Sequence, residues 1–122
     1  MLREDQGCQI LAGVFAARGY PVKRDVPFAE GKVSFEIDGF NAEHRVGFEF
    51  RTDEAGDKDD LDDDELLELA RRMEANELFI FVIDDVSVDS EADLTQYAHG
   101  FLDEVERRVG KGQKGRALCT TL

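Results

Sequence analysis

Hydrophobic residues recur with the spacing of an amphipathic helix in three parts of the chain. The first part lies within residues 2–18 and is followed by Gly19, a residue type that often ends helices. The second follows aspartates that suit a helix N-cap and runs to Asn76, and the third ends at Gly110. We therefore predict three helices, with these apolar positions: Ile10, Leu11, Val14, Phe15 and Ala17; Leu61, Leu66, Leu69, Ala70 and Met73; Leu94, Ala98, Phe101, Leu102, Val105 and Val109.

The segments between the helices have the patterns of strands. Residues 32–52, KVSFEIDGFNAEHRVGFEFRT, alternate in polarity and predict two strands around a turn centred on Ala42 and Glu43. Residues 20–28 form a weaker first strand, whose two prolines favour a sheet edge. Residues 78–84, LFIFVID, are continuously apolar before a final aspartate, which is typical of a strand covered on both faces, and we expect this strand to be central.

These elements predict an α/β domain of order αβββαβα, with a central four-stranded mixed sheet flanked by helices. A chain of 122 residues is long enough for one domain and too short for two. We assign residues 1–109 to this domain. Residues 110–122 are basic and rich in glycine, so we expect a solvated tail that contributes little to the core.

The apolar residues of the predicted hairpin fix its register if they share one face: Val33, Phe35, Ile37, Val46, Phe48 and Phe50. That register places Asp38 opposite Gly47 and Glu36 opposite Glu49. Asp38 and Glu49 are then diagonal neighbours about 7 to 8 Å apart, close enough to share a cation. Two facing glutamates are unfavourable unless something positive lies between them, and Mg²⁺ and Arg51 are the two candidates.

Charge narrows the classes of partner. The formal net charge is -13, which repels nucleic acid and anionic membranes, so a nucleic-acid partner is disfavoured. No apolar run approaches the roughly 20 residues of a membrane span, and the first residues lack the features of a signal peptide. The only cysteines, Cys8 and Cys119, are far apart, which suits a reducing cytoplasm better than a disulfide scaffold. We expect a cytoplasmic protein.

Three short motifs occur in series: RGY at residues 18–20, FEID at 35–38 and FEFRT at 48–52. This series resembles the PD-(D/E)XK nuclease superfamily, nearest to its small Holliday-junction-resolvase-like members, which have an αβββαβ core. The resemblance implies a restriction-endonuclease-like fold and metal-dependent phosphodiester hydrolysis. It also implies that Asp38, Glu49 and the backbone carbonyl of Phe50 bind Mg²⁺, with Arg51 as a further catalytic residue.

Two residues depart from the family pattern. Arg51 stands where the family has a lysine, and an arginine stays protonated, so it can hold phosphate but cannot act as a base. Cys8 stands where the family has a helix glutamate, and a thiol is a poor ligand for Mg²⁺. We therefore interpret the chain as a degenerate, non-catalytic nuclease-fold module that has no cofactor and binds or regulates a protein partner.

Two other functions stay open. The first is an active Mg²⁺-dependent DNA endonuclease or resolvase that uses Asp38, Glu49 and Arg51. The second is an acidic inhibitor or immunity protein whose residues 53–68 mimic a nucleic acid; this run lacks the residue order of an EF-hand. A homo-oligomer is a further alternative for either class.

The remaining candidate residues have simpler explanations. His44 and His99 have no third metal ligand at a suitable spacing, and we expect both on the surface. Phe79 and Phe81 have apolar neighbours, so we expect them in the core rather than on a base-stacking surface.

Overall fold

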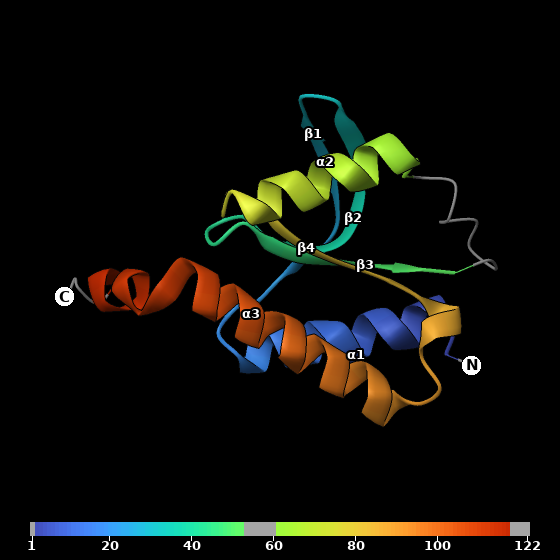
Figure 1. Ribbon diagram of the computed structural model, residues 1–122. Helices are drawn as coiled ribbons and strands as arrows, with labels where there is room; N and C mark the ends of the chain where they lie inside the picture. Colours follow the sequence, from blue (N-terminus) through green and yellow to red (C-terminus); the bar gives the residue numbers. More distant parts are fainter. Residues whose placement is uncertain (1, 53–60, 118–122) are drawn as a thin grey trace.

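The computed structural model describes residues 2–52 and 61–117, and the side chains of the second segment as far as residue 109. Its elements follow the predicted order αβββαβα (Figure 1). They are α1 (Glu4–Ala17), β1 (Lys23–Glu30), β2 (Val33–Asn41), β3 (Val46–Arg51), α2 (Asp63–Glu74), β4 (Phe79–Asp84), the short 3-10 helix η2 (Asp85–Ser87) and α3 (Glu91–Ala117).

The four strands form one mixed sheet in the order β1-β2-β3-β4. The pairs β1–β2 and β2–β3 are antiparallel, whereas β3–β4 is parallel. The predicted edge position of the first strand is confirmed, although β1 extends to Glu30. The prediction that the LFIFVID strand is central is wrong, because β4 is the other edge of the sheet among the described residues.

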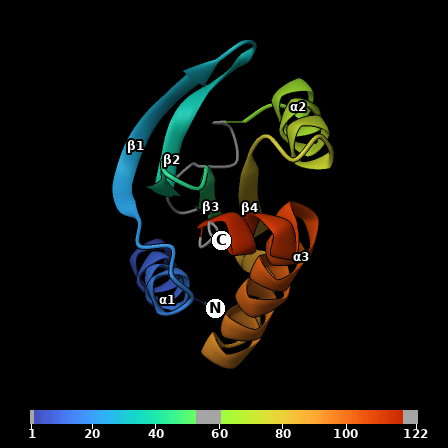
Figure 2. The ribbon, with the colours of Figure 1, turned by 90° about the vertical axis from the view of Figure 1, so that its left-hand side faces the viewer.

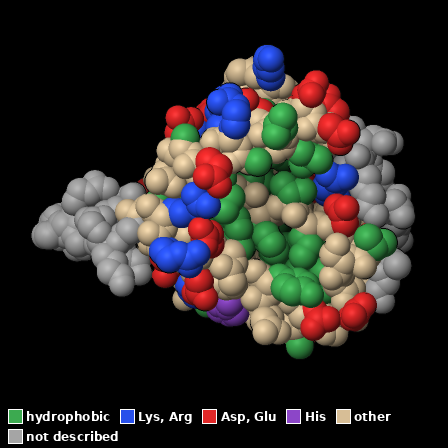
Figure 3. All heavy atoms as spheres, in the orientation of Figure 1, with side chains coloured by type: hydrophobic (Ala, Val, Ile, Leu, Met, Phe, Trp, Pro, Cys, Tyr) green, Lys and Arg blue, Asp and Glu red, His purple; other side chains and the backbone are tan. Residues whose placement is uncertain are grey.

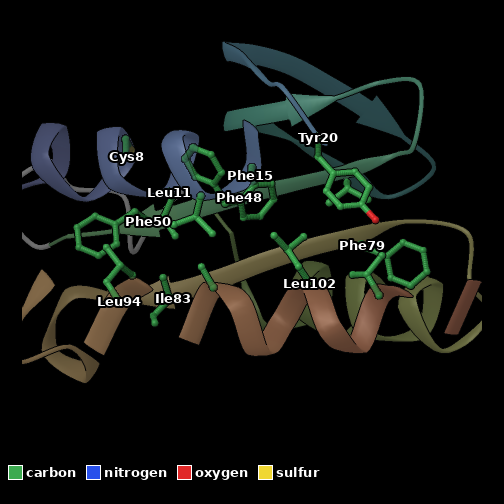
Figure 4. Packing of buried hydrophobic residues seen from close by; sticks show 14 of the residues in the cluster. Cys8, Leu11, Phe15, Tyr20, Phe48, Phe50, Phe79, Ile83, Leu94 and Leu102 are labelled. Carbon is green, nitrogen blue, oxygen red and sulfur yellow. The ribbon is translucent and has the colours of Figure 1, made fainter. Parts of the chain in front are cut away.

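Helices cover both faces of the sheet (Figure 2). On one face, α1 and α3 pack against β3 and β4 through a core that includes Leu11, Phe15, Phe48 and Phe50. Figure 4 shows the two phenylalanines of β3 lying between α1 and α3. On the other face, α2 packs on a second core formed by Phe28, Val33, Phe35, Ile37, Phe40, Leu61, Leu69, Leu78 and Ile80. None of the helices in the described residues is long and apolar enough to cross a membrane.

The β2–β3 hairpin differs from its predicted register by two residues. The observed pairs are Gly39↔Phe48, Phe40↔Gly47 and Asn41↔Val46, so Gly47 faces Phe40 and not Asp38. The loop is also longer than predicted. It spans residues 42–45, with the Asn41 side chain accepting a hydrogen bond from the backbone N–H of His44 at 2.8 Å and Arg45 at a φ of 56°.

The predicted shared face of the hairpin is also wrong. Ile37 packs in the core under α2, whereas Phe48 and Phe50 pack under α1 and α3. The reason is a local irregularity in β2, where Ile37 and Phe40 lie in the same core although they are three positions apart along the strand. Strict alternation would place them on opposite faces.

The same irregularity is visible in the neighbouring strand. The ladder between β1 and β2 skips from Arg24↔Gly39 to Val26↔Ile37, and Asp25, at the skipped position, has a φ of 56°. The part of the β1–β2 hairpin between this position and its turn therefore bends toward α2, while the part on the other side stays beside β3 (Figure 2). This bend lies directly beside Asp38.

The helix ends agree with the predictions at two places and disagree at a third. Gly19 adopts a φ of 95° after α1, and Asp62 caps α2 by accepting a hydrogen bond from the backbone N–H of Glu65 at 2.8 Å. The predicted stop at Gly110 is wrong, because α3 continues to Ala117. Residues 110–117 of the expected tail are thus a continuation of the last helix.

We expect Gly7→Ala to lower the free energy of unfolding by about 1–2 kcal/mol. A Cβ at Gly7 would lie 2.5 Å from the ring of Phe50, which is fully buried. Overpacking of this kind costs about 1–3 kcal/mol, of which the better helix propensity of alanine offsets up to about 1 kcal/mol. Urea denaturation measures the difference.

Gly13→Ala in the same helix is the matched control, since nothing lies within 4 Å of a Cβ at that position. It should raise stability by up to about 1 kcal/mol. A Gly7→Ala variant as stable as Gly13→Ala would show that α1 does not press on β3 at this point.

Candidate functional site

Asp38 and Glu49 meet where the ladder between β2 and β3 ends. They are the next residues on the two strands beyond the pair Gly39↔Phe48. The Glu49 carboxylate accepts a hydrogen bond from the backbone N–H of Asp38 at 3.0 Å, and the Asp38 carboxylate accepts one from the backbone N–H of Phe50 at 2.9 Å. The two carboxylates thus connect the strands at the point where the backbone ladder stops.

This junction is almost closed to solvent. Asp38 is 6% exposed and Glu49 is 1% exposed. Gly39 makes the close packing next to it possible, because a Cβ there would lie 2.4 Å from the ring of Phe48. Buried carboxylates are rarely found without hydrogen bonds or ionic partners, and backbone N–H groups supply part of that need here.

Cys8 of α1 borders the same junction. Its side chain is fully buried, and burial is the main reason that the pKa of the thiol lies well above its usual range. The negative charge of Asp38 raises the pKa further, while the charge of Arg24 lowers it. Cys8 is therefore a neutral thiol at physiological pH and does not replace the family's helix carboxylate as a ligand for a hard cation.

The predicted register implied that Arg51 neutralises Glu36 and Glu49. In the structure, Arg51 has a different ion-pair partner. Its Nε lies 3.1 Å from an Oδ of Asp84 on β4, in register with the pair Arg51↔Asp84. The contact is an ion pair whose geometry does not make an aligned hydrogen bond. Glu36 is exposed and lies opposite Pro27 of β1, so the predicted pair Glu36–Glu49 does not form.

Arg24 is a neighbour of the site that the sequence pattern does not indicate. Its Nε donates a hydrogen bond to the backbone carbonyl of Asp38 at 2.7 Å. The sequence signal for this contact is weak, because Arg24 lies in the proline-containing segment that is predicted only as a weak edge strand. Its position opposite Gly39 depends on the β1–β2 register, which the polarity pattern of that segment does not fix.

Two further buried polar residues lie at the same end of the sheet. Thr52 follows β3 and Asp85 follows β4, and they are 1% and 4% exposed. Because β3 and β4 are parallel, their carboxyl ends meet at one edge of the sheet, where α/β proteins commonly place functional groups. Thr52 is the last residue of the FEFRT motif, whereas the sequence pattern did not indicate Asp85.

Two hard oxygen ligands for a cation thus come together, as predicted, but the rest of the predicted donor set differs in character. Cys8 is a buried neutral thiol, and Arg51 is paired with Asp84. Within residues 2–52 and 61–109, no group of three histidine, cysteine or carboxylate side chains is arranged to hold a metal ion. The donor set therefore matches a Mg²⁺ site only in Asp38 and Glu49.

The other predicted residues lie away from this junction. His44 is exposed and packs edge-on against Tyr20, as expected for a surface histidine. His99 is partly exposed, with Nδ1 2.9 Å from the Arg18 guanidinium, so its surface position agrees only in part with the prediction. Phe79 lies in the core as predicted. Much of the acidic run lies outside the described residues; its last part, Asp62 onward, begins α2.

Comparison of the chain with protein-family models, with curated proteins and with solved structures finds no match.

We expect Asp38→Ala to lower the free energy of unfolding by about 1–3 kcal/mol, because the buried N–H of Phe50 loses its acceptor. Asp38→Asn keeps an oxygen at that position and should cost clearly less. Glu36→Ala, an exposed change on the same strand, is the control and should stay within about 0.5 kcal/mol of the wild type. Chemical denaturation compares them; an Asn variant as unstable as the Ala variant would contradict the acceptor role.

A double-mutant cycle tests the corrected partner of Arg51. We expect a coupling free energy of about 0.5–1 kcal/mol between Arg51→Ala and Asp84→Ala, since the pair is partly buried at 13% and 36% side-chain exposure. The cycle between Arg51→Ala and Glu36→Ala should give a value near zero. Coupling to Glu36 that equals the coupling to Asp84 would restore the original assignment.

Proposed function

We propose that this protein is a non-catalytic module of the PD-(D/E)XK nuclease type that binds or regulates a protein partner. The observation that carries the proposal is the use of Asp38 and Glu49 as hydrogen-bond acceptors for the backbone of the facing strand. In an active enzyme of this family, the residues at these positions would serve the metal ion. Here they also join β2 to β3.

The element order supports the nuclease-like half of the proposal. The chain has helix, three strands, helix and strand in the αβββαβ order of the family, followed by α3. The two acidic residues of the motif lie on the second and third strands and contact each other through a backbone N–H. This juxtaposition is what the motif requires, whether or not the site still binds metal.

The neighbours of the two carboxylates support the non-catalytic half. An active site of this class needs a positive group directed at the scissile phosphate. Arg51, at the lysine position, is instead paired with Asp84, whose negative charge would also repel a phosphate. The protonated thiol of Cys8 adds no charge to the site, and the chain as a whole carries a net charge of -13.

Metal binding and DNA cleavage test the proposal together. We expect no Mg²⁺- or Mn²⁺-dependent cleavage of branched, duplex or single-stranded DNA. We also expect millimolar Mg²⁺ to leave the melting temperature unchanged, because a ligand that binds only the native state would raise it by mass action. The melting temperature is measured at constant ionic strength, so that screening of the net charge is the same in each sample.

Glu49→Gln is the matched variant, since it keeps an oxygen acceptor for the Asp38 N–H while removing the charge that a cation needs. Cleavage by the wild-type protein that is lost in a folded Glu49→Gln variant would overturn the non-catalytic assignment. It would establish the alternative, a Mg²⁺-dependent endonuclease that uses Asp38, Glu49 and Arg51. Cleavage that both proteins share would instead indicate a contaminating nuclease.

A further inference from the structure

No strand pairs with the outer edge of β4 in the described part of the chain. On its inner edge β4 pairs with β3, and the N–H of Phe79 donates to the carbonyl of Arg45 at 2.9 Å. Successive residues of a strand turn their N–H and C=O groups to opposite edges, so those of Ile80 and Val82 point away from β3. They form a short row of backbone donors and acceptors at the sheet edge.

A groove runs along this edge between α2 and α3. It consists of two adjoining hollows of about 280 and 440 Å³; apolar residues line the smaller one, whereas the Arg51–Asp84 ion pair and Ser87 also line the larger one. Both are lined by Leu66 of α2 and by Phe81 and Val82 of β4, and Phe101 of α3 lines one of them. Figure 3 shows hydrophobic side chains gathered in the hollow between the two helices.

The apolar character extends beyond the floor of the groove. Tyr97 is 47% exposed and lies one turn before the lining residue Phe101 on α3. Natural proteins usually protect a sheet edge with charges, prolines or a covering element. The sequence of β4, FIFVID, contains no proline and only one charged residue, at its end.

The helices on both sides of the groove are acidic. The α2 sequence contains five acidic residues and two arginines, and residues 91–109 of α3 also contain five acidic residues and two arginines. The arginines are ion-paired, and these pairs also occupy Glu68, Glu74 and Glu104, so each segment keeps three more acidic residues than arginines. The pairs are Arg71 with Glu68, Arg72 with Glu68 and Glu30, Arg107 with Glu104, and Arg108 with Glu104 and Glu74. A second copy of this chain, with its own net charge of -13, is therefore a poor electrostatic match.

We propose that the outer edge of β4 binds an extended segment of a basic partner protein, which adds to the sheet as a fifth strand. The partner's backbone pairs with Ile80 and Val82, its apolar side chains enter the groove, and its lysines or arginines lie against the acidic helices. This inference rests on the proposed function and names the partner surface of that module. It needs neither metal nor DNA.

Two labelled peptides of about ten residues test the inference by fluorescence anisotropy. In one, valine alternates with lysine and threonine; in the other, glutamate replaces each lysine. We expect the basic peptide to bind and to weaken with rising ionic strength, and we expect the acidic peptide not to bind. Peptides that bind equally well would overturn the charge argument, and failure of both to bind would overturn the docking site.

Val82→Pro removes the outward N–H without removing a hydrogen bond to β3, and proline is tolerated at sheet edges. It should weaken binding about tenfold, the effect of one lost hydrogen bond. Val82→Thr keeps both the β-branched shape and the N–H, so it should bind like the wild type. Equal affinity of a folded Val82→Pro variant would exclude pairing through this edge.

Amide hydrogen exchange of the wild-type protein tests the geometry even if Val82→Pro fails to fold. In the free protein, the N–H groups of Ile80 and Val82 should exchange faster than those of Phe79 and Phe81, and the basic peptide should protect the first pair selectively. Protection of all four amides to the same extent would contradict strand addition.

Light scattering of the protein alone tests whether a second copy of the chain binds to the edge of β4 instead. A concentration-dependent dimer that Val82→Pro abolishes would mean that a second copy occupies β4, and the basic-partner proposal would be wrong. If neither peptide binds and Mg²⁺ neither supports cleavage nor raises the melting temperature, only the docking site is wrong. If metal-dependent cleavage is observed, the proposed function is wrong regardless of peptide binding.

Discussion

The two hydrogen bonds between the carboxylates of Asp38 and Glu49 and the backbone of the facing strands connect β2 to β3 beyond the end of their backbone ladder. Beyond Gly39 the backbone ladder of β2 and β3 stops, and the β1–β2 hairpin bends toward α2. Hydrogen bonds to a charged acceptor are roughly twice as strong as neutral ones, and a buried N–H without an acceptor is costly. The carboxylates therefore allow the bend without leaving Asp38 N–H and Phe50 N–H unsatisfied.

The same bend determines which of the two cores each part of the β2–β3 hairpin joins. The outer part of β2 gives its apolar residues to the core under α2, while β3 gives Phe48 and Phe50 to the core under α1 and α3. The Asp38–Glu49 junction lies where the two cores separate. A change that loosened the Asp38–Glu49 junction would act on both cores, because the part of the β1–β2 hairpin that packs against α2 is connected to β3 through this junction.

Much of the fold was predictable, because helix and strand periods and end signals are local. The element order, the edge position of β1, the N-cap Asp62 and the end of α1 at Gly19 all follow from nearby residues. The hairpin register was not predictable in this way. It depends on the long loop held by Asn41 and on the bend beside Asp38, and a rule of strict alternation assumes a regular strand. The approach of Asp38 to Glu49 was predicted from a hairpin register that differs from the observed one by two residues, whereas the ion pair of Arg51 with Asp84 required the parallel pairing of β3 and β4.

The position of β4 shows that a strand can have both faces covered while one of its edges is unpaired, a difference that a run of hydrophobic residues does not reveal. A continuously apolar strand indicates that both faces are covered, and α2 and α3 do cover the faces of β4. It does not indicate that both edges are paired, since backbone N–H and C=O groups are the same in every sequence. A strand that is apolar on both faces and open at one edge has fewer protective charges than an ordinary edge strand. On an acidic protein, an unpaired edge with apolar faces favours the partner proposed above, which supplies both a strand and positive charge.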